Sequence, residues 1–358
     1  MNIETMLRIL LFPVLVVLAV LYAAVMFLRN CLFDFNLRKL NRVLDAKVIC
    51  VGNLTAGGTG KTPVVALLVQ ELIKKGFATG IVSRGYGGTY EKSLAKSSVQ
   101  VDPKIENAAR VFGDEPTWLC EELKTQVWVG RDKFSTALSM LRDSQEKVNV
   151  VLADDAFQHR QLARDLDILI IDATAKCLEY LPLPLARGRE DFILGLRRAD
   201  IIVLNKINLV SQTRLQNIER LLMFLKSKKT LLVSVSNRIE EFSFLGSTQK
   251  LQAKALKGEA IFLVSAIAKP AQFAELVLQS TGAKLVGEKL FSDHSNYEIQ
   301  SLQFVEKVAL EKKAKYIVVT EKDAVKLKGV ELKVPILVSS LKLSAPELLD
   351  AVVSRLSR

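Results

Sequence analysis

The sequence contains few of the side chains that bind transition metals or form disulfide bonds. Its 358 residues include only two histidines and four cysteines. No two cysteines have the spacing of metal ligands, and a zinc site that needs several histidines is nearly excluded. A disulfide framework is not expected either, which is typical of a protein from a reducing compartment.

The chain is also poor in aromatic residues, at 7%, although its net charge is +12. Basic residues are not interleaved with aromatic ones, and no nucleic-acid-binding module is recognisable, so we expect no nucleic-acid partner. The excess positive charge lies at the two ends, with +3 in residues 1–47, zero in 48–200 and +9 in 201–358. Basic ends of this kind are consistent with an anionic membrane surface.

Charge is absent from residues 9–28, an apolar run of 20 residues. As a helix it would be about 30 Å long, the thickness of the hydrocarbon core of a membrane. The leader before it has one acid and one base, which argues against a cleaved signal peptide, and a buried core helix is normally shorter. We therefore expect a membrane helix over residues 1–30, either spanning the membrane or lying in its interface. Basic residues after it predict that the rest of the chain is cytoplasmic.

The remaining chain alternates short Val/Ile/Leu-rich runs with amphipathic stretches. This pattern predicts an α/β fold in which parallel strands are covered by helices. Helices are expected over 63–75 and 270–280. Ten strands are expected, over 47–51, 79–83, 127–129, 149–153, 167–171, 200–204, 230–234, 260–264, 315–320 and 335–338. A polar stretch over 236–257 suggests a junction, so we expect one α/β domain over 31–240 and a second, smaller one over 241–358.

The clearest local motif is a glycine-rich loop that follows the first expected strand. The loop reads Thr55-Ala56-Gly57-Gly58-Thr59-Gly60-Lys61-Thr62, and Pro63 then begins a helix. Backbone N–H groups of such a loop surround phosphate oxygens, the lysine neutralises phosphate charge, and the threonine hydroxyl binds Mg²⁺. Only the first glycine of the usual motif is missing, since its position is Thr55. The loop predicts a nucleoside triphosphate and magnesium as cofactors.

A carboxylate on the metal side is expected at the end of a later strand. The run that ends in Asp154 and Asp155 fits, because the carboxyl ends of parallel strands form the ligand-binding edge of an α/β sheet. A GTPase that acts as a partner-binding switch is the main alternative. It would require Asn-Lys-x-Asp to recognise guanine, but the corresponding run Asn205-Lys206-Ile207-Asn208 lacks the aspartate. We therefore interpret Asn205 and Lys206 as the end of a strand.

Further motifs occur in a fixed order along the chain. They are Ser-Arg-Gly-Tyr-Gly-Gly at 83–88, Gly-Asp-Glu-Pro at 113–116, Gly-Arg-Asp at 130–132, Asp-Asp-Ala-Phe-Gln-His at 154–159, Phe-Ser-Asp-His at 291–294 and Thr-Glu-Lys-Asp-Ala-Val-Lys at 320–326. With the phosphate loop and the apolar N-terminus, this order resembles the tetraacyldisaccharide 4′-kinase (lipid A 4′-kinase) family over nearly the whole chain. The resemblance implies two α/β/α domains and a P-loop kinase. Such a kinase transfers the γ-phosphate of ATP to the 4′-hydroxyl of a tetraacylated glucosamine disaccharide 1-phosphate, at the cytoplasmic face of the inner membrane.

The resemblance also implies roles for individual residues. Asp114 is expected to accept the proton of the hydroxyl, with His294 orienting it, and Glu115 is a further candidate for the metal side. Contacts with the substrate or its phosphates are expected from Arg84, Tyr86, Arg131, Gln158 and His159. Ala156 stands where the family commonly has glycine. Lys322 and Asp323 resemble a family motif on the second domain, and no role is assigned to them. Acyl-chain preference, oligomeric state and the carboxylate that binds Mg²⁺ directly stay open.

Overall fold

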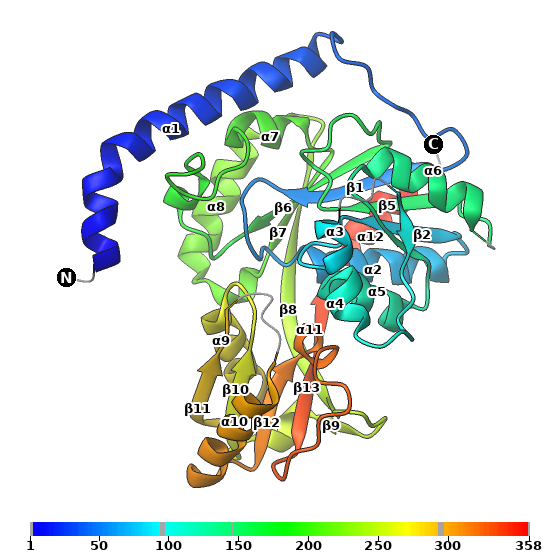
Figure 1. Cartoon of the computed structure of the whole chain (residues 1–358). Coiled ribbons are helices and arrows are strands. Elements are labelled where there is room, and N and C mark those ends of the chain that lie inside the picture. Colours follow the sequence, from blue (N-terminus) through cyan, green and yellow to red (C-terminus); the bar gives the residue numbers. More distant parts are fainter. Residues whose placement is uncertain (1–2, 94–96, 145, 293–296, 357–358) are drawn as a thin grey trace. The chain divides into compact units, whose positions relative to one another are not determined.

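The computed structural model describes residues 3–93, 97–144, 146–292 and 297–356 (Figure 1). The chain forms two compact units, each made from separate stretches of sequence. Unit 1 comprises Met1–Lys61, Ser144–Val235 and Ala345–Arg358, and unit 2 comprises Thr62–Asp143 and Ser236–Ser344. The chain passes from unit 1 to unit 2 within the long strand β8 (Leu231–Phe244).

Unit 1 is built on a parallel sheet. Its strands lie in the order β5 (Val150–Asp154), β1 (Lys47–Asn53), β6 (Leu166–Asp172), β7 (Ile201–Asn205) and the first part of β8. Nearly every residue of β1, β5, β6 and β7 is buried, as expected for strands covered on both faces. Since all strands run in the same direction, Asn53, Asp154, Asp172 and Asn205 end at one edge of the sheet.

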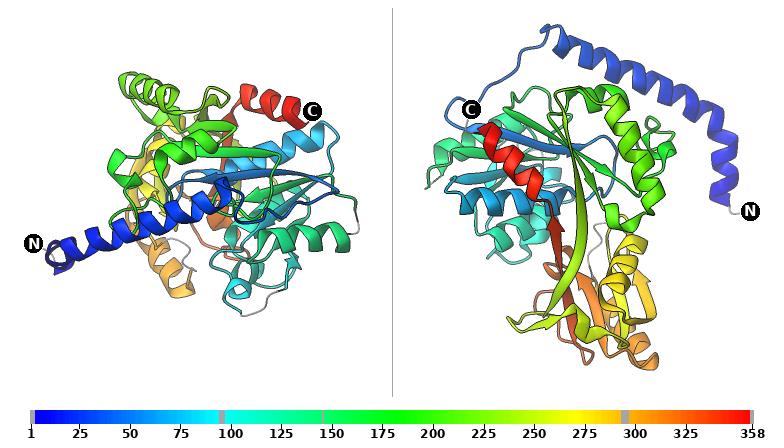
Figure 2. Two further views of the ribbon diagram at one scale, coloured as in Figure 1. Left: turned by 90° about the horizontal axis from the view of Figure 1, so that it is seen from above. Right: turned by 180° about the vertical axis from the view of Figure 1, so that it is seen from behind.

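Helices complete unit 1. They are α1 (Ile3–Asp34), α7 (Phe192–Arg198), α8 (Gln212–Leu225), α12 (Pro346–Leu356) and the short 3₁₀ segments η1 (Cys177–Tyr180) and η2 (Ile207–Leu209). The helix α1 is long and apolar, contains Pro13 and is bent in its first part (Figure 1). The C-terminal helix α12 follows β13 and brings the end of the chain back to unit 1 (Figure 2).

Unit 2 contains two groups of elements. The first comprises α2 (Lys61–Lys74, from its second residue), β2 (Thr79–Ser83), α3 (Thr89–Lys92), β3 (Val99–Gln100), α4 (Ala108–Phe112), α5 (Asp114–Leu123), β4 (Val127–Val129) and α6 (Lys133–Asp143). The second comprises the end of β8, β9 (Lys250–Gln252), η3 (Ala253–Leu256), β10 (Ala260–Ser265), α9 (Pro270–Thr281), β11 (Lys284–Leu290), α10 (Ile299–Glu311), β12 (Tyr316–Thr320), α11 (Glu321–Ala324) and β13 (Ile336–Ser344). Strands β11, β10, β12 and β13 are parallel neighbours, and β13 pairs antiparallel with β8.

The predicted α/β architecture is confirmed, since all ten expected strands and both expected helices are present. Two strands end at least six residues later than expected. β8 continues to Phe244 and β13 to Ser344, because the two strands pair there. In this part of β8 buried and more exposed side chains alternate, whereas the residues of β13 after Ser339 are half-buried or exposed, so neither segment is a continuous apolar run. The short strands β3 and β9 and the largely exposed β11 were missed, because they contain no continuous apolar run. β8 runs through residue 240, and the domain boundary expected there stays a prediction.

The buried carboxyl group of Glu321, at the start of α11, makes the stability of unit 2 depend on pH. Burial and the nearby Glu122 raise its pKa to about 8, although hydrogen bonds with Ser340 and the backbone of Leu341 favour the charged form. Folding therefore takes up a proton at Glu321 between the ordinary carboxyl pKa and about pH 8, and stability falls as the pH rises through this range.

Replacement of Glu321 by glutamine should remove this dependence. We expect Glu321→Gln to raise the Tm at pH 9, relative to the unchanged protein, by roughly 2–4 °C, the shift typical of 1 kcal/mol in a domain of 150–250 residues. At pH 5, where the carboxyl group is protonated in the folded state, the difference should be smaller. Thermal unfolding at the two pH values measures this, and a gain of equal size at both would contradict it.

Candidate active site

The phosphate loop connects the end of β1 with the start of α2 in the expected strand–loop–helix order. Gly57 and Gly60 have φ values of +106° and +83°, which side chains other than glycine rarely adopt. Thr55, which replaces the first glycine of the motif, is buried and forms an antiparallel bridge with Gly188. Its backbone oxygen accepts a hydrogen bond from Asn53 Nδ2 at 2.7 Å. Thr55 therefore has the extended backbone of a β-bridge, and this position does not require the left-handed conformation that favours glycine.

The ammonium group of Lys61 lies between two oxygen atoms of unit 1. It donates to Asn53 Oδ1 at 3.1 Å and lies 3.4 Å from Asp155 Oδ1. Only 12% of the lysine side chain is exposed. A lysine at the first position of the helix after a glycine loop, held in this way, can neutralise the charge of a bound phosphate. Thr62 follows as the second residue of α2.

Residues at the ends of two further strands support the same loop. Asn205 Nδ2 donates to the backbone oxygen of Thr59 at 3.1 Å. Lys206 Nζ donates to Asp172 Oδ2 at 2.8 Å and to the backbone oxygen of Gly58 at 3.4 Å. Asn205 ends β7, as expected, and Lys206 directly follows the strand, but both residues also hold the loop in place. The similarity of Asn205-Lys206 to the Asn-Lys-x-Asp motif of guanine sites was the signal that could have shown that these residues lie beside the phosphate loop.

The acid pair lies at the carboxyl end of β5, as predicted from its position after an apolar run. Asp154 is buried, and Asp155 has a left-handed φ of +47°. Arg189 Nη1 lies 3.2 and 3.1 Å from the two carboxylate oxygens of Asp155. Ala156 is not among the residues with positive φ, so its methyl group causes no backbone strain at the position where the family commonly has glycine.

Gln158 and His159 lie in the turn after this pair. Gln158 Nε2 donates to the backbone oxygen of Asn53 at 2.8 Å and is 3.4 Å from Glu190 Oε2. His159 is half-buried, and its backbone N–H donates to the oxygen of Ala156. Both residues thus lie in the same unit as the phosphate loop, and Gln158 contacts the end of β1 directly.

The remaining predicted residues lie in unit 2, where the glycine motifs at 83–88 and 113–116 meet. Cβ atoms added at Gly88 and Gly113 would lie 2.6 Å from the oxygen of Val111 and 2.8 Å from the oxygen of Tyr86. Only glycine allows these two turns to approach so closely. The contact brings Tyr86, which is 63% exposed, next to the start of α5, where Asp114 lies.

Arg84 and Arg131 both contact Glu91 of α3. Arg84 Nε lies 2.7 Å from Glu91 Oε1, and Arg131 donates to the Glu91 backbone oxygen at 2.9 and 3.2 Å. Both arginine side chains remain accessible to solvent. They form a pair of guanidinium groups on one surface of unit 2, an arrangement suited to a phosphate group.

Asp114 forms an ion pair that the sequence did not predict. Lys326 Nζ lies 2.7 Å from Asp114 Oδ2, and the two side chains are 3% and 8% exposed. Next to it, Lys322 Nζ lies 3.3 Å from Glu115 Oε1. Lysines 322 and 326 belong to the Thr-Glu-Lys-Asp-Ala-Val-Lys motif, whose role is therefore to pair with the Gly-Asp-Glu-Pro acids. The fixed order of the two motifs was a signal, but their 207-residue separation hid the contact.

Asp323 holds the lysine-bearing turn in place. Its buried carboxylate accepts from the Ala266 backbone N–H at 3.2 Å and from Thr320 Oγ1 at 2.7 Å, and burial raises its pKa. Asp293 and His294 lie outside the described residues, so the expected pairing of His294 with Asp114 stays a prediction. In the described part of the chain, no group of three or more His, Cys, Asp or Glu side chains could hold a metal ion by itself.

Comparison with known proteins identifies the family. The family model described as tetraacyldisaccharide-1-P 4′-kinase matches residues 11–357. The chain belongs to this family. It is 35% identical to the tetraacyldisaccharide 4′-kinase of Bdellovibrio bacteriovorus, covering 87% of this chain and 88% of that protein. The enzyme of the same name from Syntrophus aciditrophicus is 33% identical, with coverages of 88% and 84%.

A solved structure has the same fold as this family member. The crystal structure of LpxK from Aquifex aeolicus in complex with ATP matches with a TM-score of 0.70 and 27% identity. The match covers 98% of this chain and 99% of the other. The resemblance based on ordered motifs is thus confirmed at the level of family and fold.

The two lysines of the 320–326 motif offer a test within this family member. Replacement of Lys326 by methionine leaves the buried Asp114 without its ammonium partner. Removal of one partner of a buried ion pair lowers the free energy of unfolding by roughly 3–5 kcal/mol. We expect Lys326→Met to lower kcat by at least about tenfold, whereas Lys322→Met, whose partner Glu115 is 32% exposed, should have an effect below about threefold. Steady-state phosphorylation kinetics and thermal unfolding measure both, and equal effects on kcat would contradict a special role of Lys326.

Proposed function

We propose that this protein transfers the γ-phosphate of ATP to the 4′-hydroxyl of tetraacyldisaccharide 1-phosphate, a step of lipid A biosynthesis. Membership of the family over residues 11–357 is the observation that carries the proposal. The ordered phosphate loop around Lys61 and the buried pair of Asp114 and Lys326 support it, because phosphoryl transfer needs charge neutralisation and a group that accepts the hydroxyl proton.

Unit 1 carries the residues for the phosphate donor. Backbone N–H groups of residues 57–60 would bind the phosphates of ATP, and Lys61 would neutralise charge on the transferred phosphoryl group. Asn53 and Asp155 hold the ammonium group of Lys61 at the end of the loop. Gln158 and His159 would lie near the same phosphates.

The donor set also suits Mg²⁺. This ion usually binds one or two carboxylates together with substrate phosphates and water, and hydroxyl and carboxylate oxygens are present in Thr62, Asp154 and Asp155. When bound, the ion would neutralise charge between the β- and γ-phosphates. Glu115 is a further candidate, and its carboxylate contacts Lys322 as that of Asp155 contacts Arg189 and Lys61.

Unit 2 carries the residues for the acceptor. Asp114 would accept the proton of the 4′-hydroxyl as the bond to phosphorus forms. Lys326 compensates the charge of this buried carboxylate and fixes its orientation. Arg84 and Arg131, which share Glu91, would bind the 1-phosphate of the lipid, and the exposed ring of Tyr86 would contact its sugar or acyl part.

The helix α1 would attach the protein to the cytoplasmic face of the inner membrane. Leu11–Asp34 is long and apolar enough to cross a membrane, with a mean hydropathy of 2.8. Its second half, however, has two different faces. Asn30 and Phe33 are buried, whereas Val25 and Leu28 on the other side are 65% and 63% exposed. A helix with protein on one face and exposed apolar side chains on the other is suited to lie in the membrane interface.

The activity is tested with the full-length protein, tetraacyldisaccharide 1-phosphate, ATP and Mg²⁺. We expect phosphate to appear on the 4′-hydroxyl. Lys61→Ala should lower kcat by about 10²–10³-fold, the effect of losing one group that stabilises transition-state charge. Asp114→Asn should lower it by about 10²–10⁴-fold, as loss of a general base does.

Lys74→Ala is the matched control, because Lys74 lies at the other end of α2 with 68% of its side chain exposed. It should leave kcat unchanged. Absence of the 4′-phosphorylated product would contradict the proposed reaction, and a strong preference for GTP over ATP would favour the GTPase alternative.

Membrane attachment is tested by changing only the exposed face of α1. We expect the triple substitution of Leu21, Val25 and Leu28 by glutamine to abolish co-sedimentation with vesicles of phosphatidylethanolamine and phosphatidylglycerol. Each buried apolar side chain contributes roughly 1.5–3 kcal/mol, so the loss of three should be decisive.

The same substitution of three exposed apolar residues on α8 is the control for this test. Leu221, Met223 and Phe224 are 45%, 58% and 85% exposed, and their replacement by glutamine should leave co-sedimentation unchanged. Equal losses for the two variants would show that α1 is not the main attachment.

A further inference from the structure

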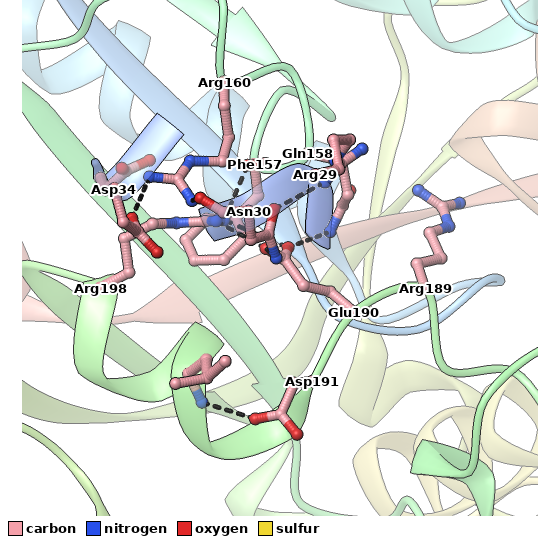
Figure 3. Close-up of polar contacts among 12 residues, drawn as sticks. Arg29, Asn30, Asp34, Phe157, Gln158, Arg160, Arg189, Glu190, Asp191 and Arg198 are labelled. Atoms are coloured by element: carbon pink, nitrogen blue, oxygen red, sulfur yellow. Dashed lines mark hydrogen bonds and ion pairs between the residues drawn. The ribbon is translucent and has the colours of Figure 1, made fainter. Parts of the chain in front are cut away.

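The second half of α1 forms hydrogen bonds with two consecutive residues, Arg189 and Glu190. Tyr22 Oη donates to the backbone oxygen of Arg189 at 3.1 Å. Asn30 Nδ2 donates to Glu190 Oε1 at 2.8 Å (Figure 3). All four residues belong to unit 1. The helix is therefore attached to this two-residue segment at points two turns apart.

The other side of this segment contacts the phosphate site. Arg189 holds both carboxylate oxygens of Asp155, and its backbone N–H donates to the oxygen of Leu54, at the start of the phosphate loop, at 2.8 Å. Asp155 in turn lies 3.4 Å from Lys61 Nζ. Only Arg189 and Asp155 thus separate Tyr22 of the membrane helix from the phosphate-binding lysine.

Glu190 provides a second connection to the same lysine. Its side chain is fully buried and lies between Asn30, Arg198 and Gln158, with Arg198 Nη1 at 2.6 Å (Figure 3). Gln158 donates to the Asn53 backbone oxygen, and Asn53 Oδ1 accepts from Lys61. A buried carboxylate with three polar partners allows few alternative geometries, because leaving any partner unpaired would be costly.

Packing of α1 does not require these polar groups. Asn30 is 3% exposed in a helix that is otherwise apolar over most of its length, and burying an amide is unfavourable unless it is hydrogen-bonded. An alanine or leucine would pack against the body of unit 1 without this condition. The amide instead places the helix in one register relative to Glu190, and Arg160 secures that register by donating to the Asn30 backbone oxygen at 3.1 Å.

We infer that Tyr22 and Asn30 are positioning residues, through which the membrane helix α1 holds Arg189 and Glu190 and thereby the ATP-binding groups Asp155 and Lys61. This inference rests on the proposed function for its kinetic consequence. When α1 lies against the membrane with these hydrogen bonds intact, the phosphate site has the geometry described above. When the hydrogen bonds of Tyr22 and Asn30 are lost, Asp155 and Asn53 hold the ammonium group of Lys61 less firmly.

The test uses full-length protein bound to vesicles and compares three substitutions on α1. Asn30→Ala removes the amide, Tyr22→Phe removes one hydroxyl group, and Cys31→Ser, which replaces the half-buried neighbour of Asn30 by a side chain of similar size, is the matched control. We expect Asn30→Ala to lower kcat/KM for ATP about tenfold, the effect of losing a hydrogen bond to a charged group, and Tyr22→Phe about threefold. The KM for the lipid and co-sedimentation with vesicles should not change for any of the three.

ATP affinity, measured by equilibrium binding, shows whether the effect passes through Lys61. In the Lys61→Ala background, Asn30→Ala should change the ATP affinity by less than about twofold, because residues that act through one another are not additive. The same loss of affinity in both backgrounds would overturn the inference. So would unchanged ATP kinetics in both variants, or a loss of co-sedimentation with kinetics otherwise normal.

The outcomes also separate this inference from the proposed function. If the unchanged protein binds ATP but forms no 4′-phosphorylated product, the proposed function fails, and the affinity measurements still decide the inference. If Asn30→Ala does not fold, Tyr22→Phe decides it, because this variant keeps the aromatic ring and removes a single oxygen atom.

Discussion

The position of one ammonium group, that of Lys61, organises the phosphate site. A cation with 12% of its side chain exposed needs nearby oxygen atoms, and the structure supplies them from Asn53 and Asp155. Asn53 ends β1 and Asp155 directly follows its parallel neighbour β5, so the sheet itself determines where the charge lies. The loop before the lysine is then supported by Asn205 from a further strand of the same sheet.

The segment over residues 187–190 connects this site with the rest of unit 1. The backbone oxygen of Arg187 accepts from Ala56, and Gly188 forms a bridge with Thr55. The next residue, Arg189, binds Asp155, and Glu190 is enclosed by Arg198, Gln158 and Asn30. A short stretch without regular secondary structure thus contacts the loop, the acid pair and the membrane helix together. It connects the helix that we propose to attach to the membrane with the groups that we propose to bind phosphate.

Unit 2 shows how two distant motifs act as one. The acids of Gly-Asp-Glu-Pro begin α5, and the lysines of the 320–326 motif lie on and just after α11. Their pairing compensates two acidic charges, one of them almost completely removed from water. Asp323 holds the lysine-bearing turn in place by accepting hydrogen bonds from Thr320 Oγ1 and the Ala266 backbone N–H. A motif without an assigned role in the sequence is therefore part of the acceptor side that we propose.

Local sequence by itself determined the ten apolar strands, the phosphate loop and the family. Buried parallel strands are continuous apolar runs, and a glycine loop before Lys61 is recognisable because its backbone conformation depends on residues that are adjacent in the chain. The partners of the charged groups were decided only by the tertiary structure. Lys326 for Asp114, Arg189 for Asp155 and Glu190 for Asn30 each join residues separated by 34 to 212 positions. Such pairs depend on how sheets and helices pack, and no local pattern specifies which distant charge a buried carboxylate will meet.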